Sequence, residues 1–272
     1  DGVQCHYCHR AGDPMLPDTS IPSVSTVPGY GNGMHAVQRY NHPKRGSRGG
    51  ILSPHETRQD GFQRKSELCG VCHDVSNPFY AQDHIAQAPF EYSPIERTYS
   101  EWAESWYATQ GESGTCQSCH MAAAAGYACI DPTSYRADLA THDLSGGNTF
   151  VPDIIGDFWP NVDSAALASG KQRAMNTLRR AARLDLQTAR TAESLFATIR
   201  LTNLTGHKLP TGYPEGRRMW LELVGLDAQG DTIMHSGAYD SSTATLLPDP
   251  QIKIYEAIRG IIIQMPPLSC PL

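Results

Sequence analysis

Three copies of the pattern Cys-x-x-Cys-His constrain the fold of this chain more than any other feature of its sequence. They occupy residues 5–9, 69–73 and 116–120. The pattern is typical of c-type haem attachment, in which both cysteines form thioethers to one porphyrin and the histidine binds its iron. We therefore predict three covalently attached haem c groups. The predicted attachment residues are Cys5, Cys8, Cys69, Cys72, Cys116 and Cys119, and the predicted iron ligands from the motifs are His9, His73 and His120.

Zinc is the main alternative for cysteine pairs of this kind. A four-cysteine zinc site usually takes two Cys-x-x-Cys pairs that are about a dozen to twenty residues apart. Here the pairs are much further apart, their number is odd, and a histidine follows the second cysteine every time. These features favour haem, with a zinc-binding structural or interaction module kept as an alternative.

Two cysteines, Cys129 and Cys270, lie outside the three motifs. Haem c is attached outside the cytoplasm, where spare thiols tend to oxidise, so we predict a disulfide between them. The alternative is that one or both are buried free thiols. The same reasoning predicts an extracellular or periplasmic protein whose signal peptide has been removed or precedes the numbering.

The composition excludes two classes of partner. The net charge of −6 and the pI near 6.0 leave no basic surface for nucleic acid or for an anionic membrane. No apolar run approaches the roughly eighteen residues of a membrane span. A hydrophobic share of 40% with 18% charged residues is typical of a globular chain.

The pattern of the chain changes along its length. Residues 1–160 hold all three motifs and many glycines and prolines, and aromatic spacing predicts one helix over 98–110. A second helix is predicted from about Ser164 to Arg183. Apolar residues then alternate with period two over 195–202, and 219–226 and 232–234 flank a turn as a hairpin, with one more strand in 251–263.

These patterns predict an α+β fold in three parts. A loop-rich, partly helical domain carrying three haems covers 1–160, and a connecting helix covers 161–183. A small antiparallel β domain covers 184–272 and contributes a second ligand to one haem.

Six-coordinate haem needs a ligand on the face opposite the motif histidine. Eleven histidines are present, which is more than enough for bis-histidine ligation of three irons. His207 lies in a loop bounded by glycine and proline, and His142 precedes Gly146 and Gly147, where missing side chains permit the close approach of a large planar group. The predicted opposite ligands are His55, His142 and His207, with His42, His84 and His35 as substitutes.

Four segments resemble bacterial and archaeal multihaem c-type cytochromes: residues 66–78, 97–102, 116–121 and 205–220. The resemblance implies a β domain after the haem region, with His207 of the Gly-His-Lys-Leu-Pro-Thr-Gly loop as a distal haem ligand. It similarly implies a ligand role for His142. Three haems is few for this group, and residues 263–272 do not continue its pattern. Some relatives polymerise into extracellular filaments, so the resemblance also implies a homo-oligomer or filament.

We therefore predict an electron-transfer protein and not an enzyme. Its partners would be other redox proteins or extracellular electron acceptors. The alternative is a multihaem redox enzyme that acts on a nitrogen or sulfur oxyanion at an iron with an open position. The chain has no Cys-x-x-Cys-Lys variant, which marks the catalytic haem of some nitrite reductases.

Overall fold

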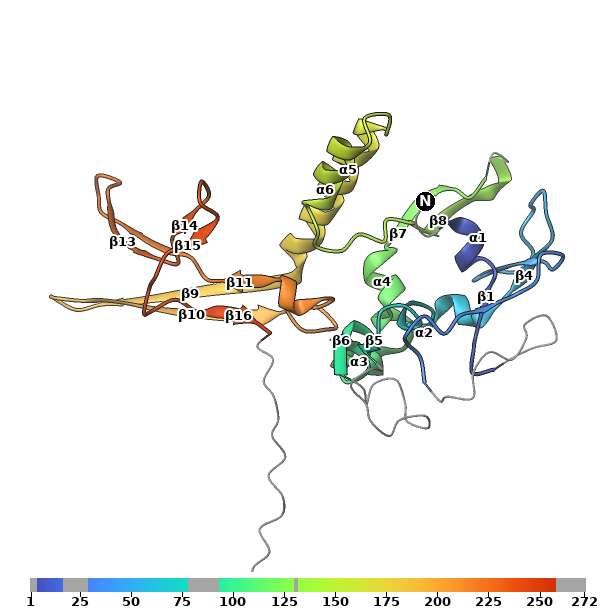
Figure 1. The fold of residues 1–272 in the computed structure, drawn as a ribbon, viewed down its shortest axis with the longest axis horizontal. Helices are drawn as coiled ribbons and strands as arrows, with labels where there is room; N and C mark the ends of the chain where they lie inside the picture. The colour runs from blue at the N-terminus through green and yellow to red at the C-terminus, as the bar shows by residue number, and fades with distance from the viewer. Residues whose placement is uncertain (1–3, 17–28, 78–92, 130–131, 258–272) are drawn as a thin grey trace, which may run out of the picture. The chain divides into compact units, whose positions relative to one another are not determined.

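The structure is a computed structural model and describes residues 4–16, 29–77, 93–129 and 132–257 (Figure 1). Two residues that the sequence singled out, His84 and Cys270, lie outside these ranges. The chain divides into two compact units, residues 1–208 and 209–272. The strands up to residue 203 belong to the first unit.

The first part of unit 1 consists of short elements joined by turns. Its helical segments are α1 (Cys5–Cys8), η1 (Gly61–Arg64), α2 (Glu67–Gly70), α3 (Thr98–Ala103), η4 (Trp106–Gly114), α4 (Cys116–His120) and η5 (Pro132–Ser134). Its strands are β1 (Ala11–Gly12), β2 (Ala36–Val37), β3 (Lys44–Gly46), β4 (Thr57–Gln59), β5 (Val75–Asn77), β6 (Ser93–Glu96), β7 (Ala123–Tyr127) and β8 (Tyr135–Ala140).

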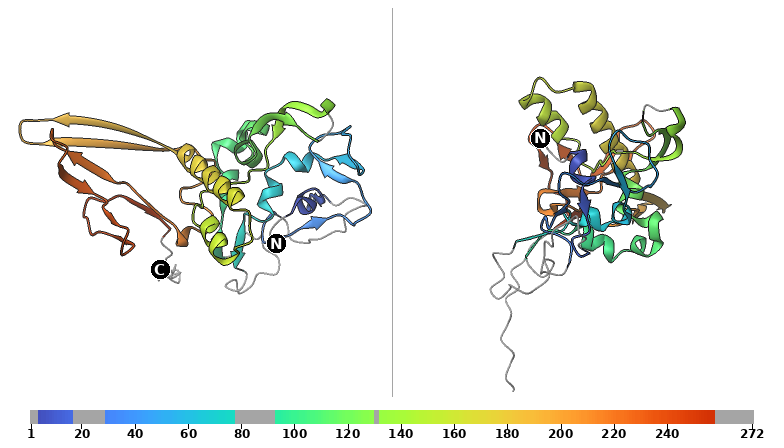
Figure 2. Two further views of the ribbon diagram at one scale, coloured as in Figure 1. Left: turned by 90° about the horizontal axis from the view of Figure 1, so that it is seen from above. Right: turned by 90° about the vertical axis from the view of Figure 1, so that its right-hand side faces the viewer.

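The second part of unit 1 has longer elements. Helix α5 (Val151–Phe158) lies beside α6 (Ser164–Ala181), and Lys171 of α6 contacts Asp153 of α5 at 2.6 Å (Figure 2). The side chain of Asp163 caps α6 by accepting from the amides of Ala165 and Ala166. Strand β9 (Ala182–Arg190) follows α6 directly and pairs with β10 (Leu195–Asn203) in antiparallel register.

Unit 2 contains η6 (Pro214–Gly216), β11 (Arg218–Trp220), β12 (Leu223–Leu226), β13 (Thr232–Ser236), β14 (Tyr239–Asp240), β15 (Thr245–Leu246) and β16 (Ile254–Glu256). Its antiparallel pairs are β11 with β16, β12 with β13, and β14 with β15. The predicted hairpin around the 227–231 turn is confirmed by β12 and β13, with a bulge at Gly225 and Leu226.

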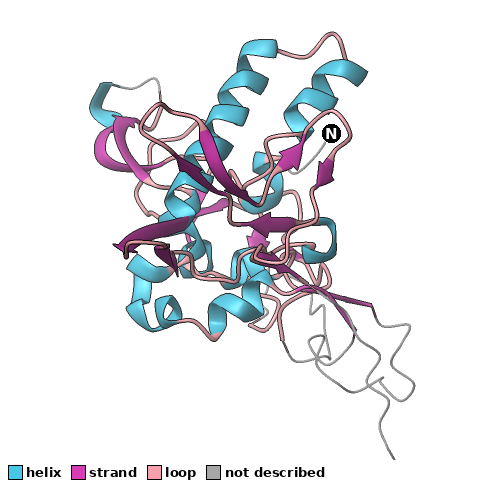
Figure 3. Ribbon diagram, turned by 90° about the vertical axis from the view of Figure 1, so that its left-hand side faces the viewer, coloured by secondary structure: helices cyan, strands magenta, loops and turns pink. Residues whose placement is uncertain are grey.

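Among the described residues, every strand belongs to a two-stranded ribbon, and no larger sheet forms (Figure 3). Seven of the ribbons are antiparallel, and β3 with β4 is parallel. The predicted α+β, loop-rich fold class is therefore confirmed. The predicted helix over 164–183 is also confirmed, ending at Ala181.

The predicted helix over 98–110 is wrong as a single element. It divides into α3 and η4, because Ser105 takes extended backbone angles between them. The fold-back is held by the indole of Trp102, which donates to the carbonyl oxygen of Gly114 at 2.7 Å, and by the Ser105 hydroxyl, which donates to the Trp102 carbonyl. Local polar bonds of this kind compete with a continuous helix.

Few apolar side chains are fully buried in the described part of the chain. They are Ala11, Ala36, Phe62, Val71 and Ala174, and only Phe62 is large. Buried polar side chains, among them Gln38, Arg45, Ser66 and Asp74, are at least as prominent. Protein side chains alone therefore form a small core, as expected where porphyrins supply apolar volume.

Candidate haem-binding sites

The first and third Cys-x-x-Cys pairs lie within α1 and α4, and the second pair begins in α2 and ends in the turn that follows it. Cysteines three residues apart lie on the same face of a helical turn, so both thiols of a pair can reach one flat group. Helix α4 begins cleanly because the Thr115 side chain accepts from the amide of Ser118 at 3.3 Å. The histidine that closes each motif follows at the end of its turn.

The three motifs lie close together within unit 1. The Cys69 thiol donates to the sulfur of Cys116, which raises the pKa of Cys69 and lowers that of Cys116 to about 7. The Cys116 amide also donates to the Ser66 hydroxyl at 3.0 Å. Cys8 lies near enough to Cys72 for the two thiols to interact electrostatically. The second motif is therefore next to both of the others.

All three motif histidines are oriented through Nδ1. His9 donates to the carbonyl oxygen of Arg45 at 2.8 Å, and His120 donates to that of Ser145 at 2.9 Å. His73 donates to the carboxylate of Glu96 at 2.9 Å. Metal-binding histidines usually donate their other ring nitrogen in this way, which fixes the tautomer and leaves Nε2 for the metal. No hydrogen bond engages Nε2 of these rings within the described ranges.

Two of the motif histidines face a second imidazole. The ring centroids of His9 and His142 are 6.2 Å apart with ring planes inclined by 33°, and those of His120 and His207 are 6.5 Å apart at 25°. A metal–imidazole bond is about 2.0 Å long and its nitrogen lies about 1.1 Å from the ring centroid, so two rings on opposite sides of one ion have centroids roughly 6 Å apart. Both pairs have the spacing that one iron requires.

The loop that carries His207 is held by aromatic and acidic residues of α3 and η4. Gly206 lies so close to Trp102 that an added Cβ would be 3.0 Å from the indole. The Tyr107 hydroxyl donates to the carbonyl oxygen of Leu204 at 2.9 Å, and the Lys208 amide donates to Glu101 at 3.0 Å. The loop is therefore fixed on both sides of the histidine.

His207 is also prepared chemically for metal binding. Its Nδ1 donates to the carbonyl oxygen of Lys208 at 3.0 Å. Burial lowers the pKa of His207, with a smaller contribution from the neighbouring His120. The lowered pKa favours the neutral imidazole, which is the form that binds metals.

The loop that carries His142 is held by α6. Gly147 permits close approach to Leu178, because an added Cβ would lie 2.7 Å from its methyl group. The hydroxyls of Ser145 and Thr177 are hydrogen bonded at 3.2 Å. The same loop returns to the third motif, since the amide of Leu144 donates to the carbonyl oxygen of His120 at 3.0 Å. One loop thus serves both the first and the third motif.

His73 has no second imidazole opposite it in the described residues. The predicted ligand His55 is exposed and contacts its neighbours, with Nδ1 donating to the Glu56 carbonyl oxygen at 3.2 Å. Of the substitutes, His35 is hydrogen bonded to Tyr7 inside the first motif, and His84 lies outside the described residues. The sixth ligand of the second motif stays a prediction.

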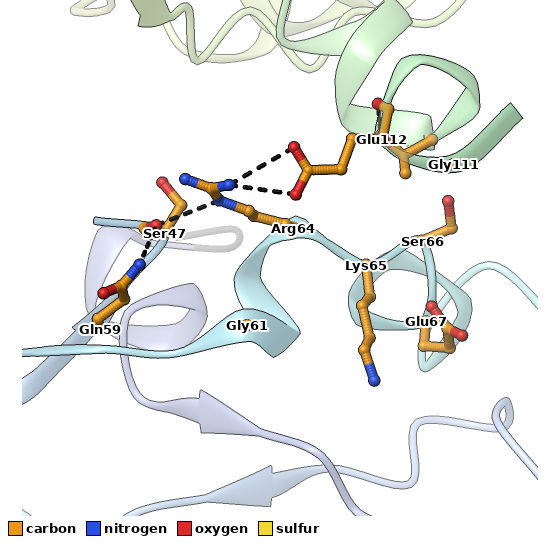
Figure 4. Close-up of a pocket in the computed structure, with 10 residues that line it drawn as sticks. Ser47, Gln59, Gly61, Arg64, Lys65, Ser66, Glu67, Gly111 and Glu112 are labelled. Atoms are coloured by element: carbon orange, nitrogen blue, oxygen red, sulfur yellow. Dashed lines mark hydrogen bonds and ion pairs between the residues drawn. The ribbon is translucent and has the colours of Figure 1, made fainter. Parts of the chain in front are cut away.

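A pocket of about 460 Å³, lined by polar residues and glycines, lies beside η1, α2 and η4 (Figure 4). Arg64 points across it toward Glu112, with an ion-pair distance of 3.1 Å, and donates to the Ser47 carbonyl oxygen at 3.2 Å. No motif cysteine or histidine lines this pocket. It is therefore separate from the histidine pairs.

The sequence did not predict the groups that accept a hydrogen bond from Nδ1 of the three motif histidines. Two of them, Arg45 and Ser145, act through backbone oxygens, which leave no residue signal. Glu96 does carry a signal, because it immediately precedes the 97–102 segment, but its pairing with His73 depends on how β5 and β6 meet.

The chain is similar in structure to a solved cytochrome. Neither the family models nor the curated proteins match this chain. The solved structure is the crystal structure of a penta-heme cytochrome c552 from Thermochromatium tepidum, with 18% sequence identity and a TM-score of 0.50. It covers 89% of this chain and 54% of that protein, so the chain spans about half its length.

The residues present fit haem c. Each motif supplies two thiols and one imidazole on a single turn, and two motifs face a second imidazole at iron-binding distance. None of the helices in the described ranges is long and apolar enough to cross a membrane. The likeness to the cytochrome c552 shows that the fold of this chain is similar to that of part of a multihaem c-type cytochrome.

Proposed function

We propose that this protein transfers electrons through three covalently bound c-type haems. The observation that carries the proposal is the pairing of His9 with His142 and of His120 with His207, which matches bis-histidine ligation. Haem iron supplies reversible one-electron chemistry, and two strong imidazole ligands leave no position open for a substrate. The two thiols of each motif would then attach one haem, and the histidine of the motif would bind its iron.

The placement of the motifs supports transfer along a row. Cys69 lies against Cys116, and Cys8 lies near Cys72, so neighbouring attachment points are close together. Closely spaced attachment points are what a short electron-transfer chain requires. We propose that the second motif is the middle member of the row.

We further propose that the protein acts in the periplasm or outside the cell, since covalent haem attachment takes place there. Its partners are then other redox proteins or extracellular acceptors. Assembly into a homo-oligomer or filament is supported by the resemblance to multihaem cytochromes stated above. Negative-stain electron microscopy of the purified holoprotein tests it: filaments support this assembly, and single particles at high concentration contradict it.

A second candidate function rests on His73. Because no imidazole of the described residues faces it, the iron of the second motif is the one that could keep an open position. The protein would then be a redox enzyme acting on a nitrogen or sulfur oxyanion. Replacement of His55 and, separately, of His84 by alanine identifies the ligand. The replacement that turns one haem high spin marks the histidine that binds this iron.

The deciding experiment uses the full chain, exported and matured in a host that attaches haem c. Intact mass should show three haems, and EPR spectra of the ferric protein should show low-spin iron throughout. Carbon monoxide should leave the ferrous spectrum unchanged. A haem that is high spin and binds carbon monoxide would favour the enzyme, and zinc in place of haem would contradict both functions.

A further inference from the structure

The three motif histidines differ in what accepts their Nδ1 proton. His9 and His120 donate to neutral backbone carbonyl oxygens, at 2.8 and 2.9 Å. His73 donates to a carboxylate oxygen of Glu96, at 2.9 Å. The distances are similar, so the difference lies in the charge of the acceptor.

The fold holds Glu96 in place beside His73. Glu96 ends strand β6, where it lies opposite Val75 of β5, and β5 begins shortly after the motif. The Glu96 side chain is mostly buried, at 22% exposure. The neighbouring cation, Arg97, pairs with Asp74 at 2.6 Å. The Glu96 carboxylate thus lies at the end of β6 beside His73, and its Oε1 also accepts from the Thr98 hydroxyl at 3.4 Å.

A carboxylate acceptor changes the ligand as well as its orientation. Hydrogen bonds to an ionised acceptor are roughly twice as strong as those between neutral groups. A stronger pull on the Nδ1 proton makes the imidazole a more electron-rich ligand, and acceptors of this kind tune the metal that the histidine binds. An electron-rich ligand favours ferric over ferrous iron.

We propose that Glu96 is a positioning residue that fixes His73 and gives the iron of the second motif a lower reduction potential than it would have beside a neutral acceptor. The proposal rests on the proposed function, since it assumes that His73 binds haem iron. It assigns a distinct role to the haem of the second motif, the middle member of the row. This haem would accept an electron less readily than a haem beside a neutral acceptor, and would donate it more readily.

The test is a redox titration of the holoprotein followed by EPR, in which each low-spin ferric signal reports one haem. Glu96→Gln keeps an oxygen that can accept from Nδ1 and removes the charge. At a fixed potential the ferrous-to-ferric ratio of one haem should rise about tenfold, equivalent to a shift of about 59 mV for one electron. The signals of the other two haems should not move.

Glu104→Gln is the matched control, because Glu104 is exposed at the end of α3 and the change removes the same charge. A shift in E96Q no larger than in E104Q overturns the proposal, as does an equal shift of all three haems. Glu96→Asp keeps the charge but draws it back from Nδ1, and its haem should titrate between wild type and E96Q. This variant also decides the matter if E96Q loses its haem.

The two proposals fail in different ways. A wild-type protein without three haems by intact mass overturns the proposed function and the role of Glu96 together. A wild-type protein with three haems, and no selective shift in E96Q, overturns the role of Glu96 alone.

Discussion

The ring centroids of His207 and His120 are 6.5 Å apart. His120 belongs to the third Cys-x-x-Cys-His motif, whereas His207 lies at the end of unit 1. The two rings have no hydrogen bond to one another in the described residues, and each is held from its Nδ1 side. An arrangement that fixes two rings apart rather than in contact is suited to an atom between them.

Replacement of His207 by alanine should convert one haem to high spin. The variant removes the ring opposite His120 and leaves the motif intact, so the haem stays attached with five ligands. EPR of the ferric protein and carbon monoxide binding by the ferrous protein measure the change. His235→Ala is the control, because His235 contacts Glu222 in unit 2 and should leave all spectra as in wild type. A low-spin H207A would exclude His207 as a ligand.

Replacement of His142 by alanine should have the same effect on a different haem, because His142 faces His9. The double variant H142A/H207A should therefore contain two high-spin haems, with intensities that add. If the double variant shows only one, one of the two histidines does not bind iron, and its pairing with His9 or His120 is wrong.

Replacement of Asp74 by alanine should destabilise unit 1. Asp74 is buried and accepts from Arg97 at 2.6 Å and from the Ser100 amide at 2.9 Å. Breaking a buried ion pair by removing one partner costs about 3–5 kcal/mol. The measurement is the midpoint of unfolding in guanidinium chloride, followed by haem absorbance. Asp138→Ala should not change this midpoint measurably, because the Arg48–Asp138 pair is exposed. Equal midpoints for D74A and D138A would contradict this account.

Cys129 should be unreactive toward maleimide in the unfolded, unreduced protein. We predict that it is joined to Cys270, and Cys129 is exposed in the structure while Cys270 lies outside the described residues. Cys270→Ser should then release one reactive thiol, detectable by mass. Labelling of unreduced wild-type protein would rule out the disulfide.

The sequence predicts the chemistry of the sites better than their surroundings. The Cys-x-x-Cys-His spacing is local, so the helical turns α1, α2 and α4 follow from it directly. His142 and His207 could be predicted as ligands because glycine and proline mark stiff loops around them. Their pairing with His9 and His120 could not, since it depends on contacts between segments far apart in the chain.

The ribbon of β9 and β10 also could be predicted only in part from the sequence. Alternation predicts β10, but its partner β9 continues from α6 without a turn, and the basic residues Arg179 and Arg180 end the helix without signalling a strand. Period-two patterns identify strands but not their partners. The boundary between the units at Lys208 likewise depends on contacts between segments that the sequence does not pair.

The loop between β8 and α5 contributes residues to the surroundings of both His9 and His120. Its His142 ring faces His9, while the carbonyl oxygen of Ser145 accepts from His120 and the Ser145 hydroxyl is hydrogen bonded to Thr177 of α6. A displacement of α6 would therefore move the imidazole that faces His9 and the carbonyl oxygen that accepts from His120 at the same time. The surroundings of His9 and of His120 are therefore mechanically coupled through one loop and one helix.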